Sequence, residues 1–203
     1  MTLPPDLVAR AEALASGPRR LLGITGAPGA GKSTVAAEVV ALVGPRAVVV
    51  PMDGFHLAQT ELERIGRADR KGAPDTFDAD GFVALLARLR TAGRTVYAPE
   101  YRRDLRNAVA GAIAVPPEVT LVVVEGNYLL LDDHGFGPVA GLLDESWFLA
   151  LDDDVRLDRL VARHEAFGKS PQAARAWSHG PDENNARLVA ATAVRADVVV
   201  TPA

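Results

Sequence analysis

The amino-acid sequence predicts an α/β fold with a doubly wound, mostly parallel sheet of about five strands and helices on both of its faces. Short apolar runs such as LLGIT (21–25), AVVVP (47–51) and VTLVVV (119–124) alternate with amphipathic helical stretches. These runs lack the polar–apolar alternation of half-exposed strands, as is typical of parallel strands covered on both faces. A chain of 203 residues is long enough for one domain with its own core. We therefore expect a single domain over residues 1–203.

The expected elements begin with a short amphipathic helix over residues 6–15, because Leu7, Ala11 and Leu14 recur at helical spacing. Apolar, β-branched runs predict the strands, and helical apolar periodicity predicts the remaining helices. The expected strands are 21–25, 47–51, 95–97, 119–124, 147–151 and 197–201, and the helices are 32–43, 82–90, 155–167, 173–179 and 185–192. Such sheets bind ligands outside the carboxyl ends of their strands, so chemistry is expected in the residues after each strand.

The composition excludes several classes of protein. The chain contains no cysteine, which excludes disulfides, thiolate nucleophiles and cysteine-ligated metal sites. Its net charge of −4 is unfavourable for nonspecific nucleic-acid binding. The first residues lack the apolar core of a signal peptide, and no apolar run approaches the roughly 18 residues of a membrane span. We expect a cytoplasmic protein without a nucleic-acid or membrane partner.

The segment GAPGAGKS (26–33) fits the phosphate-loop pattern GxxxxGK[ST] and lies between a predicted strand and a predicted helix. Its glycines let successive backbone N–H groups point at phosphate oxygens, and the helix adds its positive N-terminal end. Lys32 is expected to bridge the β- and γ-phosphates, and the Ser33 hydroxyl is expected to ligate Mg²⁺. The nucleotide-binding residues predicted from this pattern are Gly26, Ala27, Pro28, Gly29, Ala30, Gly31, Lys32, Ser33 and Thr34.

A phosphate loop indicates a nucleotide but does not indicate a reaction. The guanine-reading pattern NKxD is missing, since neither Asn184 nor Asn185 is followed by Lys, which argues against a GTPase. The length leaves little room for the added modules of a motor or a transporter ATPase. A kinase that acts on a small molecule fits the length best.

Two carboxylates follow predicted strands. Asp53 comes just after the strand 47–51, which we expect to neighbour the phosphate loop, and Glu125 follows the strand 119–124. The Asp53 carboxylate would accept the proton of an attacking hydroxyl, although an Asp-Gly turn residue is an equally good interpretation. Glu125 directly follows three valines, where a charge is costly unless it is paired. We expect Glu125 to hold Mg²⁺, directly or through water.

With these residues the sequence resembles the small-molecule kinases of the group that includes uridine kinase, phosphoribulokinase and type I pantothenate kinase. It is most similar to a bacterial branch of that group labelled nucleoside/nucleotide kinases or fructose transport system kinases. MDGF followed by RKGxPxx(F/Y)D is shared with type I pantothenate kinases. The resemblance covers about residues 20–201 and rests on GITGAPGAGKST, MDGFH, RKGAPDTFD, YAPEYRRD, VVVEGNYLLL, RLVARHEAFGKS and ADVVV.

The resemblance implies a nucleoside triphosphate hydrolase fold with a helical lid, ATP as donor, Mg²⁺, Asp53 as catalytic base and Glu125 as the Mg²⁺-associated acid. Its members are often dimers, so a homodimer is an option for this chain. The sequence lacks the long C-terminal region of the pantothenate kinases and the acceptor motifs of uridine kinase. The similarity leans to a nucleoside or a sugar as acceptor and leaves pantothenate as an alternative.

Residues 53–80, which begin at Asp53 and which we call the acceptor-cover segment, are dense in charge. They form either a cover over an acceptor pocket or a solvated surface helix and turn. A second stretch, YAPEYRR (97–103), follows another predicted strand, and only one of its adjacent arginines is expected to point inward. Its tyrosines would stack on a polar acceptor and its arginines would donate hydrogen bonds, although a plain exposed loop is an equally good interpretation for each of them. The acceptor-binding residues predicted from both stretches are His56, Arg70, Lys71, Phe77, Tyr97, Tyr101 and Arg102.

Residues 155–180, which we call the lid, begin with a predicted helix. Asp152–Asp154 are expected to cap this helix rather than to bind a metal. Arg156, Arg159 and Arg163 fall on one side of the helix, where they either stay solvated or fold over the triphosphate and stabilise the transferring charge. The resemblance favours Arg159 and Arg163 as catalytic residues. The residues that it implies near the adenine are Asn184, Asn185 and Arg187.

The sequence thus predicts an ATP- and Mg²⁺-dependent kinase that transfers the γ-phosphoryl group to a hydroxyl of a small polar metabolite. A rival of another class is an ATP-binding regulator with no small acceptor, and the presence of the acceptor-cover segment favours the enzyme. Only three of the 22 basic residues are lysines, and Lys32, Lys71 and Lys169 all fall in segments assigned to chemistry. This placement reflects either a role at phosphates, where Lys and Arg are not equivalent, or codon bias.

Overall fold

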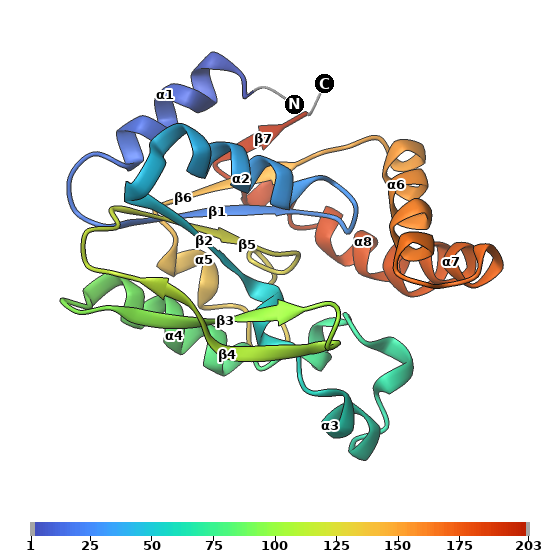
Figure 1. Ribbon diagram of the computed structural model, residues 1–203. Helices are drawn as coiled ribbons and strands as arrows, with labels where there is room; N and C mark the ends of the chain where they lie inside the picture. Colours follow the sequence, from blue (N-terminus) through green and yellow to red (C-terminus); the bar gives the residue numbers. More distant parts are fainter. Residues whose placement is uncertain (1–2, 202–203) are drawn as a thin grey trace.

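A five-stranded sheet forms the centre of the computed structural model, which describes residues 3–201 (Figure 1). The strand order is β2-β5-β1-β6-β7, and every neighbouring pair is parallel. The predicted doubly wound α/β sheet of five parallel strands is therefore confirmed. Its strands are β1 (Arg20–Gly26), β2 (Ala47–Pro51), β5 (Leu121–Glu125), β6 (Glu145–Leu149) and β7 (Val198–Val200).

Alternate side chains of the central strands enter two separate cores. Leu22, Ile24 and Val123 are buried in one core, whereas Val122 and Val124 are buried in the other. Successive side chains of a strand point to opposite faces of the sheet, so an unbroken apolar run fits a strand covered on both sides. The apolar runs of the sequence therefore require helices on both faces.

Helices provide that cover on each face, and the sheet separates the two cores. The face formed with Leu22 and Ile24 packs against α1 (Pro5–Leu14) and α2 (Lys32–Val43). The opposite face packs against α4 (Ala79–Thr91), α5 (Val139–Leu142) and α8 (Glu183–Ala190). No helix within residues 3–201 is long and apolar enough to cross a membrane.

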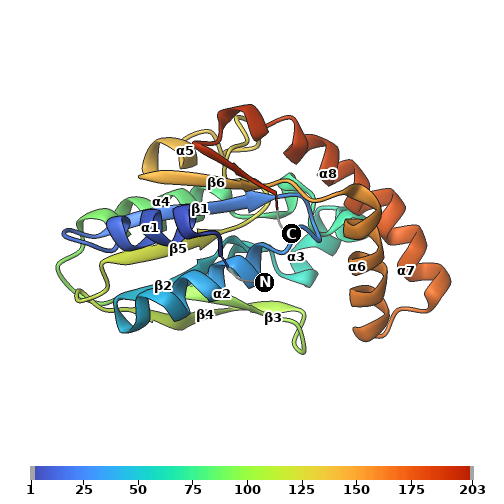
Figure 2. The ribbon, with the colours of Figure 1, turned by 90° about the horizontal axis from the view of Figure 1, so that it is seen from above.

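The lid consists of two further helices at one end of the sheet (Figure 2). α6 (Asp153–Ala166) packs against α7 (Pro171–Trp177), and the turn Ser178–Asp182 leads on to α8. The Asp152 side chain accepts hydrogen bonds from the backbone N–H groups of Asp154 and Val155. This contact confirms the predicted cap of the lid helix.

Two elements differ from the sequence prediction around residues 95–115. The strand expected over 95–97 is a longer strand, β3 (Val96–Arg102), which pairs antiparallel with β4 (Asn107–Val115) in a separate two-stranded sheet. The sequence analysis missed β4 because its Ala- and Gly-rich sequence has weak strand propensity. It also missed the short helices α3 (Gln59–Arg64) and α5.

The prediction that β2 neighbours the phosphate loop is wrong. The loop follows β1, and β5 lies between β2 and β1. The first four residues of β5 are all buried, whereas β2 is only partly buried. This burial follows from the inner position of β5, whereas β2 lies at the edge of the sheet. Asp53 nevertheless reaches the same end of the sheet as the phosphate loop, because both follow the carboxyl ends of parallel strands.

Candidate active site

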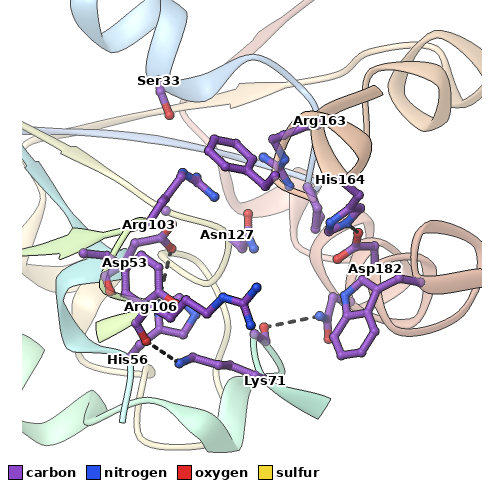
Figure 3. A pocket seen from close by; sticks show the side chains of 18 of the residues that line it. Ser33, Asp53, His56, Lys71, Arg103, Arg106, Asn127, Arg163, His164 and Asp182 are labelled. Atoms are coloured by element: carbon purple, nitrogen blue, oxygen red, sulfur yellow. Dashed lines mark hydrogen bonds and ion pairs between the residues drawn. The ribbon is translucent and has the colours of Figure 1, made fainter. Parts of the chain in front are cut away.

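A large cavity lies at the carboxyl ends of the strands (Figure 3). The phosphate loop, the acceptor-cover segment, the turn of the β3–β4 hairpin and the lid all contribute to its wall. Lys32, Lys71 and Lys169, the three lysines of the chain, line it together. The segments to which the sequence analysis assigned chemistry therefore meet in one place.

The phosphate loop has the backbone that its glycines predict. Gly29 and Gly31 have φ values of 86° and 92°, in the left-handed region, and α2 begins directly after them at Lys32. A Cβ atom on Gly29 would lie 2.8 Å from the backbone oxygen of Arg156. The helix α6 therefore packs so closely against the loop that a larger residue at Gly29 would push the two apart.

The Lys32 side chain is buried and turns back on its own loop. Its Nζ donates hydrogen bonds to the backbone oxygens of Gly26 and Ala27 at 2.9 and 3.0 Å. Burial lowers the pKa of Lys32 to about 8. Of the other predicted loop residues, Pro28, Gly29, Gly31, Ser33 and Thr34 line the cavity, and Ala30 is buried beneath it.

Ser33 and Glu125 form a pair at the cavity wall. The Ser33 hydroxyl donates to Glu125 Oε1 at 3.4 Å. Burial, followed by the nearby Asp53 carboxylate, raises the pKa of Glu125 to about 7. A cation here would favour the ionised carboxylate, and hydroxyl and carboxylate oxygens are ligands that Mg²⁺ prefers. The residues present therefore fit a Mg²⁺ ion.

Asp53 lies between this pair and the predicted acceptor side. The backbone oxygen of Asp53 is 2.8 Å from His56 Nδ1, and its carboxylate Oδ1 is 4.0 Å from the same nitrogen. The His56 ring contacts the rings of Phe77 and Tyr101, with centroids 4.0 and 4.9 Å apart. Burial lowers the pKa of His56, so the imidazole favours its neutral form. His56, Lys71, Phe77 and Tyr101 all line the cavity, as the sequence predicts.

Three predicted acceptor residues lie elsewhere. Arg70 is exposed and forms an ion pair with Asp75, outside the cavity. Tyr97 is 58% exposed at the far end of β3, and Arg102 pairs with Asp104. The hairpin has a register shift between Ala98 and Glu100, which changes the side of β3 that faces inward. This shift explains why Tyr97 and Arg102 lie outside the cavity. Tyr101 therefore reaches the cavity although Tyr97 and Arg102 do not.

Arg159 and Arg163 line the cavity from the lid, as predicted, whereas Arg156 has a structural role. The Arg156 side chain is only 1% exposed and donates to Asp153 and Glu183 at 2.9 and 2.5 Å. It also donates to the backbone oxygen of Pro28. Arg156 therefore ties α6 to the phosphate loop and to α8.

The implied adenine residues divide in a similar way. Asn185 lines the cavity and donates to the backbone oxygen of Gly72 at 3.2 Å, a bond that anchors the acceptor-cover segment. Asn184 and Arg187 are exposed, and neither lines the cavity. The expectation that these three residues act together is therefore not met.

Several residues of the cavity were not predicted from the sequence. Arg103 and Arg106 line it from the hairpin turn, and Trp177 lines it from α7, where its ring lies 4.3 Å from Lys169 Nζ. The sequence left open which of the adjacent arginines 102 and 103 points inward, but it gave no sign of the register shift that selects Arg103. Prediction of the hairpin would have indicated Arg106 as a turn residue, because the turn lies between Arg102 and Asn107.

Comparisons with known proteins agree with this geometry. Residues 21–201 match the model of the phosphoribulokinase/uridine kinase family. An ATP-dependent kinase-like protein of Aspergillus versicolor is 36% identical over 62% of this chain and 77% of its own length. A pantothenate kinase of Rhodopseudomonas palustris is 28% identical over 72% of this chain, which spans about half of that enzyme's length.

A solved structure also resembles the whole chain. It is a Silicibacter protein described as a "putative fructose transport system kinase", with 36% sequence identity and a TM-score of 0.88. The match covers 98% of this chain and 99% of that chain. The family consists of kinases that phosphorylate alcohol groups of small molecules, and it implies ATP and usually Mg²⁺. From the phosphate loop to the last strand, this chain belongs to the phosphoribulokinase/uridine kinase family.

Proposed function

We propose that this kinase transfers the γ-phosphoryl group of ATP to a hydroxyl of a small polar metabolite, a nucleoside or a sugar. The observation that carries the proposal is the position of Asp53. Its carboxylate influences the pKa values of Lys32 and Glu125, lies 4.0 Å from His56 Nδ1 and lines the same cavity as these residues. A hydroxyl held at this place would lie between the phosphate loop and the acceptor side.

Each residue has a definite task in this proposal. Asp53 orients the acceptor hydroxyl and takes its proton as the new bond to phosphorus forms. The amides of the phosphate loop and the Lys32 ammonium hold the transferring phosphoryl group. Ser33 and Glu125 would hold Mg²⁺, which neutralises charge on the phosphate oxygens when it is bound.

The lid completes the site on the opposite side. Arg159 and Arg163 would contact the phosphates and stabilise the charge that develops during transfer. Arg156 holds α6 against the phosphate loop, and so it fixes the position of the helix from which Arg159 and Arg163 extend. The lid also limits the access of water, which would otherwise compete with the acceptor hydroxyl.

The acceptor side favours an enzyme over an ATP-binding regulator. The acceptor-cover segment is anchored at the Gly72 backbone oxygen, which accepts hydrogen bonds from the Tyr128 hydroxyl at 2.6 Å and from Asn185. The rings of His56, Phe77 and Tyr101 offer stacking surfaces for a nucleoside or a sugar. The similarity to a pantothenate kinase makes pantothenate the second candidate.

The test is ADP release from MgATP, with and without nucleosides, pantothenate, and sugars in free and phosphorylated form. We expect at least one nucleoside or sugar to raise the rate more than about tenfold, as positioning of an acceptor next to a bound phosphoryl group predicts. Lys32→Ala should show no stimulation by any compound. Slow ADP release that no acceptor changes would support the regulator instead. A cytoplasmic location and a homodimer stay predictions, to be checked by cell fractionation and by light scattering.

A further inference from the structure

The arginines around the acceptor side fall into two groups. Those that point away from the cavity are paired with acids: Arg64 with Glu61, Arg67 and Arg70 with Asp75, and Arg102 with Asp104. Arg103 and Arg106, which line the cavity, form no ion pair with any acid in the part of the chain that the structure describes. Arg103 and Arg106 therefore differ from the neighbouring arginines in having no acid as partner.

The backbone of the hairpin turn places Arg106 at the cavity. Arg106 has a φ of 52°, a left-handed conformation that is uncommon for a residue with a side chain. Its backbone oxygen accepts a hydrogen bond from Lys71 Nζ at 2.9 Å, which ties the turn to the acceptor-cover segment. Lys71 Nζ also lies 5.4 Å from the Tyr101 ring centroid. Two cations from different segments are thus held next to each other at the acceptor side.

Arg103 lies between this pair and the lid. Its guanidinium lies over the Phe167 ring of the lid, 5.2 Å from the centroid. Figure 3 shows Arg103, Arg106 and Lys71 on the side of the cavity opposite Arg163 and His164. Arg106 and Lys71 therefore lie apart from the lid arginines, and Arg103 lies between the two groups.

Apart from Asp53 and Glu125, the carboxylates that line the cavity already have partners. Asp104 pairs with Arg102, Asp182 lies 2.7 Å from His164 Nε2, and Glu63 accepts from Gln59. The positive charge of Arg103 and Arg106 lowers the pKa values of neighbouring cations. Burial and Arg106 lower the pKa of Lys71, and burial and Arg103 lower the pKa of Arg163. An anion placed among these groups would relieve their mutual repulsion.

We propose that the acceptor is a hydroxylated metabolite that carries an anionic group, a phosphate or a carboxylate, and that Arg106 and Lys71 bind this group with Arg103 beside it. The hydroxyl of the same molecule then faces Asp53. This inference rests on the proposed kinase function and narrows its acceptor from small polar metabolites in general to anionic ones. Arg106 and Lys71 set specificity, and they do not take part in the proton transfer.

The kinetic test compares neutral and anionic acceptors of the same skeleton. Suitable pairs are ribose with ribose 5-phosphate and fructose with fructose 6-phosphate for phosphate, and glycerol with glycerate for carboxylate. We expect the anionic member of at least one pair to have the higher kcat/KM. Arg106→Asn, which suits the left-handed backbone, should raise the KM for that acceptor about 10- to 100-fold, as loss of a charge-assisted hydrogen bond predicts, with the KM for ATP unchanged.

Two further variants make the kinetic result specific. Arg106→Lys keeps the charge and should recover part of the loss. Arg102→Asn removes an arginine that pairs with Asp104 in the same turn and should leave both KM values unchanged. A preference for a neutral acceptor, together with a KM that Arg106→Asn does not change, would overturn the proposal that the acceptor is anionic. The proposed kinase function would not be affected by that result.

A binding experiment tests the anion site without an identified acceptor. With the nucleotide side filled by saturating MgADP, inorganic phosphate or glycerate should raise the melting temperature of the wild type and of Arg102→Asn. The same anions should bind Arg106→Asn at least about tenfold more weakly. Equal binding by all three proteins, or no binding by any, would overturn the site. The proposed kinase function is contradicted by a different result, namely that no acceptor stimulates ADP release.

Discussion

Asp53 illustrates how much depends on a single side chain in this site. It follows an edge strand of the sheet, yet its carboxylate is close enough to influence the pKa values of Lys32, Glu125 and His56. The same carboxylate would have to accept a proton during phosphoryl transfer. In the proposed function, the binding of ATP depends instead on the phosphate loop and the lid.

Asp53→Asn therefore separates chemistry from binding. We expect kcat to fall about 10²- to 10⁴-fold, the range for loss of a general base, because an amide does not accept the proton. The affinity for ATP should stay nearly the same, since Asn keeps the volume of Asp. Steady-state kinetics and calorimetric titration with MgATP measure the two quantities. A wild-type kcat in this variant would remove Asp53 from the role of base.

His56 makes the stability of the folded protein depend on pH. Its side chain is 11% exposed, and burial lowers its pKa below the ordinary value of 6.5. The unfolded chain then binds a proton at His56 at a higher pH than the folded protein does. The free energy of unfolding contributed by this residue is therefore present above pH 6.5 and is lost as the pH falls below it.

The variant His56→Gln removes this contribution. Between about pH 7 and pH 5.5, the free energy of unfolding should fall more steeply in the wild type than in the variant. Urea denaturation at a series of pH values measures both curves. Loss of the ring contacts with Phe77 and Tyr101 only offsets the variant curve, and the other titrating groups are common to both proteins. Parallel curves would contradict the assignment.

At the scale of elements, α6 divides its arginines between structure and chemistry. Arg156 is buried between Asp153 and Glu183, whereas Arg159 is exposed to the cavity one turn later. Their sequence spacing of three residues places both on the same side of the helix, so spacing alone could not separate them. The contact with Glu183 of α8, distant in the sequence, makes the difference.

Paired variants test this division. Arg156→Met should lower the free energy of unfolding by about 3 kcal/mol, because it leaves Glu183 without its buried partner. Arg159→Met should change it by less than about 0.5 kcal/mol, as is usual for an exposed residue. It should instead lower kcat about 10³-fold or more, in the range for an arginine that stabilises phosphoryl transfer. A reversal of these two effects would show that the roles are exchanged.

The elements predicted best are those whose pattern is local. The helix 32–43 and the strand 47–51 have the predicted bounds, because a glycine-rich turn and an unbroken valine run define them. The hairpin strand β4 and the register shift near Ala98 depend on pairing between strands and leave little local signal. The same reason applies to the site: the phosphate loop and His56 follow local patterns and lie at the cavity, whereas Tyr97 and Arg102 lie elsewhere and Arg106 was not predicted.

On the scale of the whole molecule, the sheet brings distant segments to one edge. The phosphate loop, Asp53 and Glu125 follow three parallel strands, and the hairpin and the lid enclose the space beyond them (Figures 1 and 2). Both cores lie within residues 3–201, which supports our proposal of a single domain. The order of the strands could not be derived from the chain alone, since β2 and β5 have similar valine-rich runs.

The central claim is that an acceptor hydroxyl near Asp53, and not water, receives the γ-phosphoryl group. It is tested most directly by ³¹P NMR of the products formed from MgATP and the acceptor that stimulates ADP release most. We predict that a new phosphate monoester of that acceptor forms in step with ADP, and that Asp53→Asn slows both signals together. Inorganic phosphate as the only product beside ADP would contradict the claim.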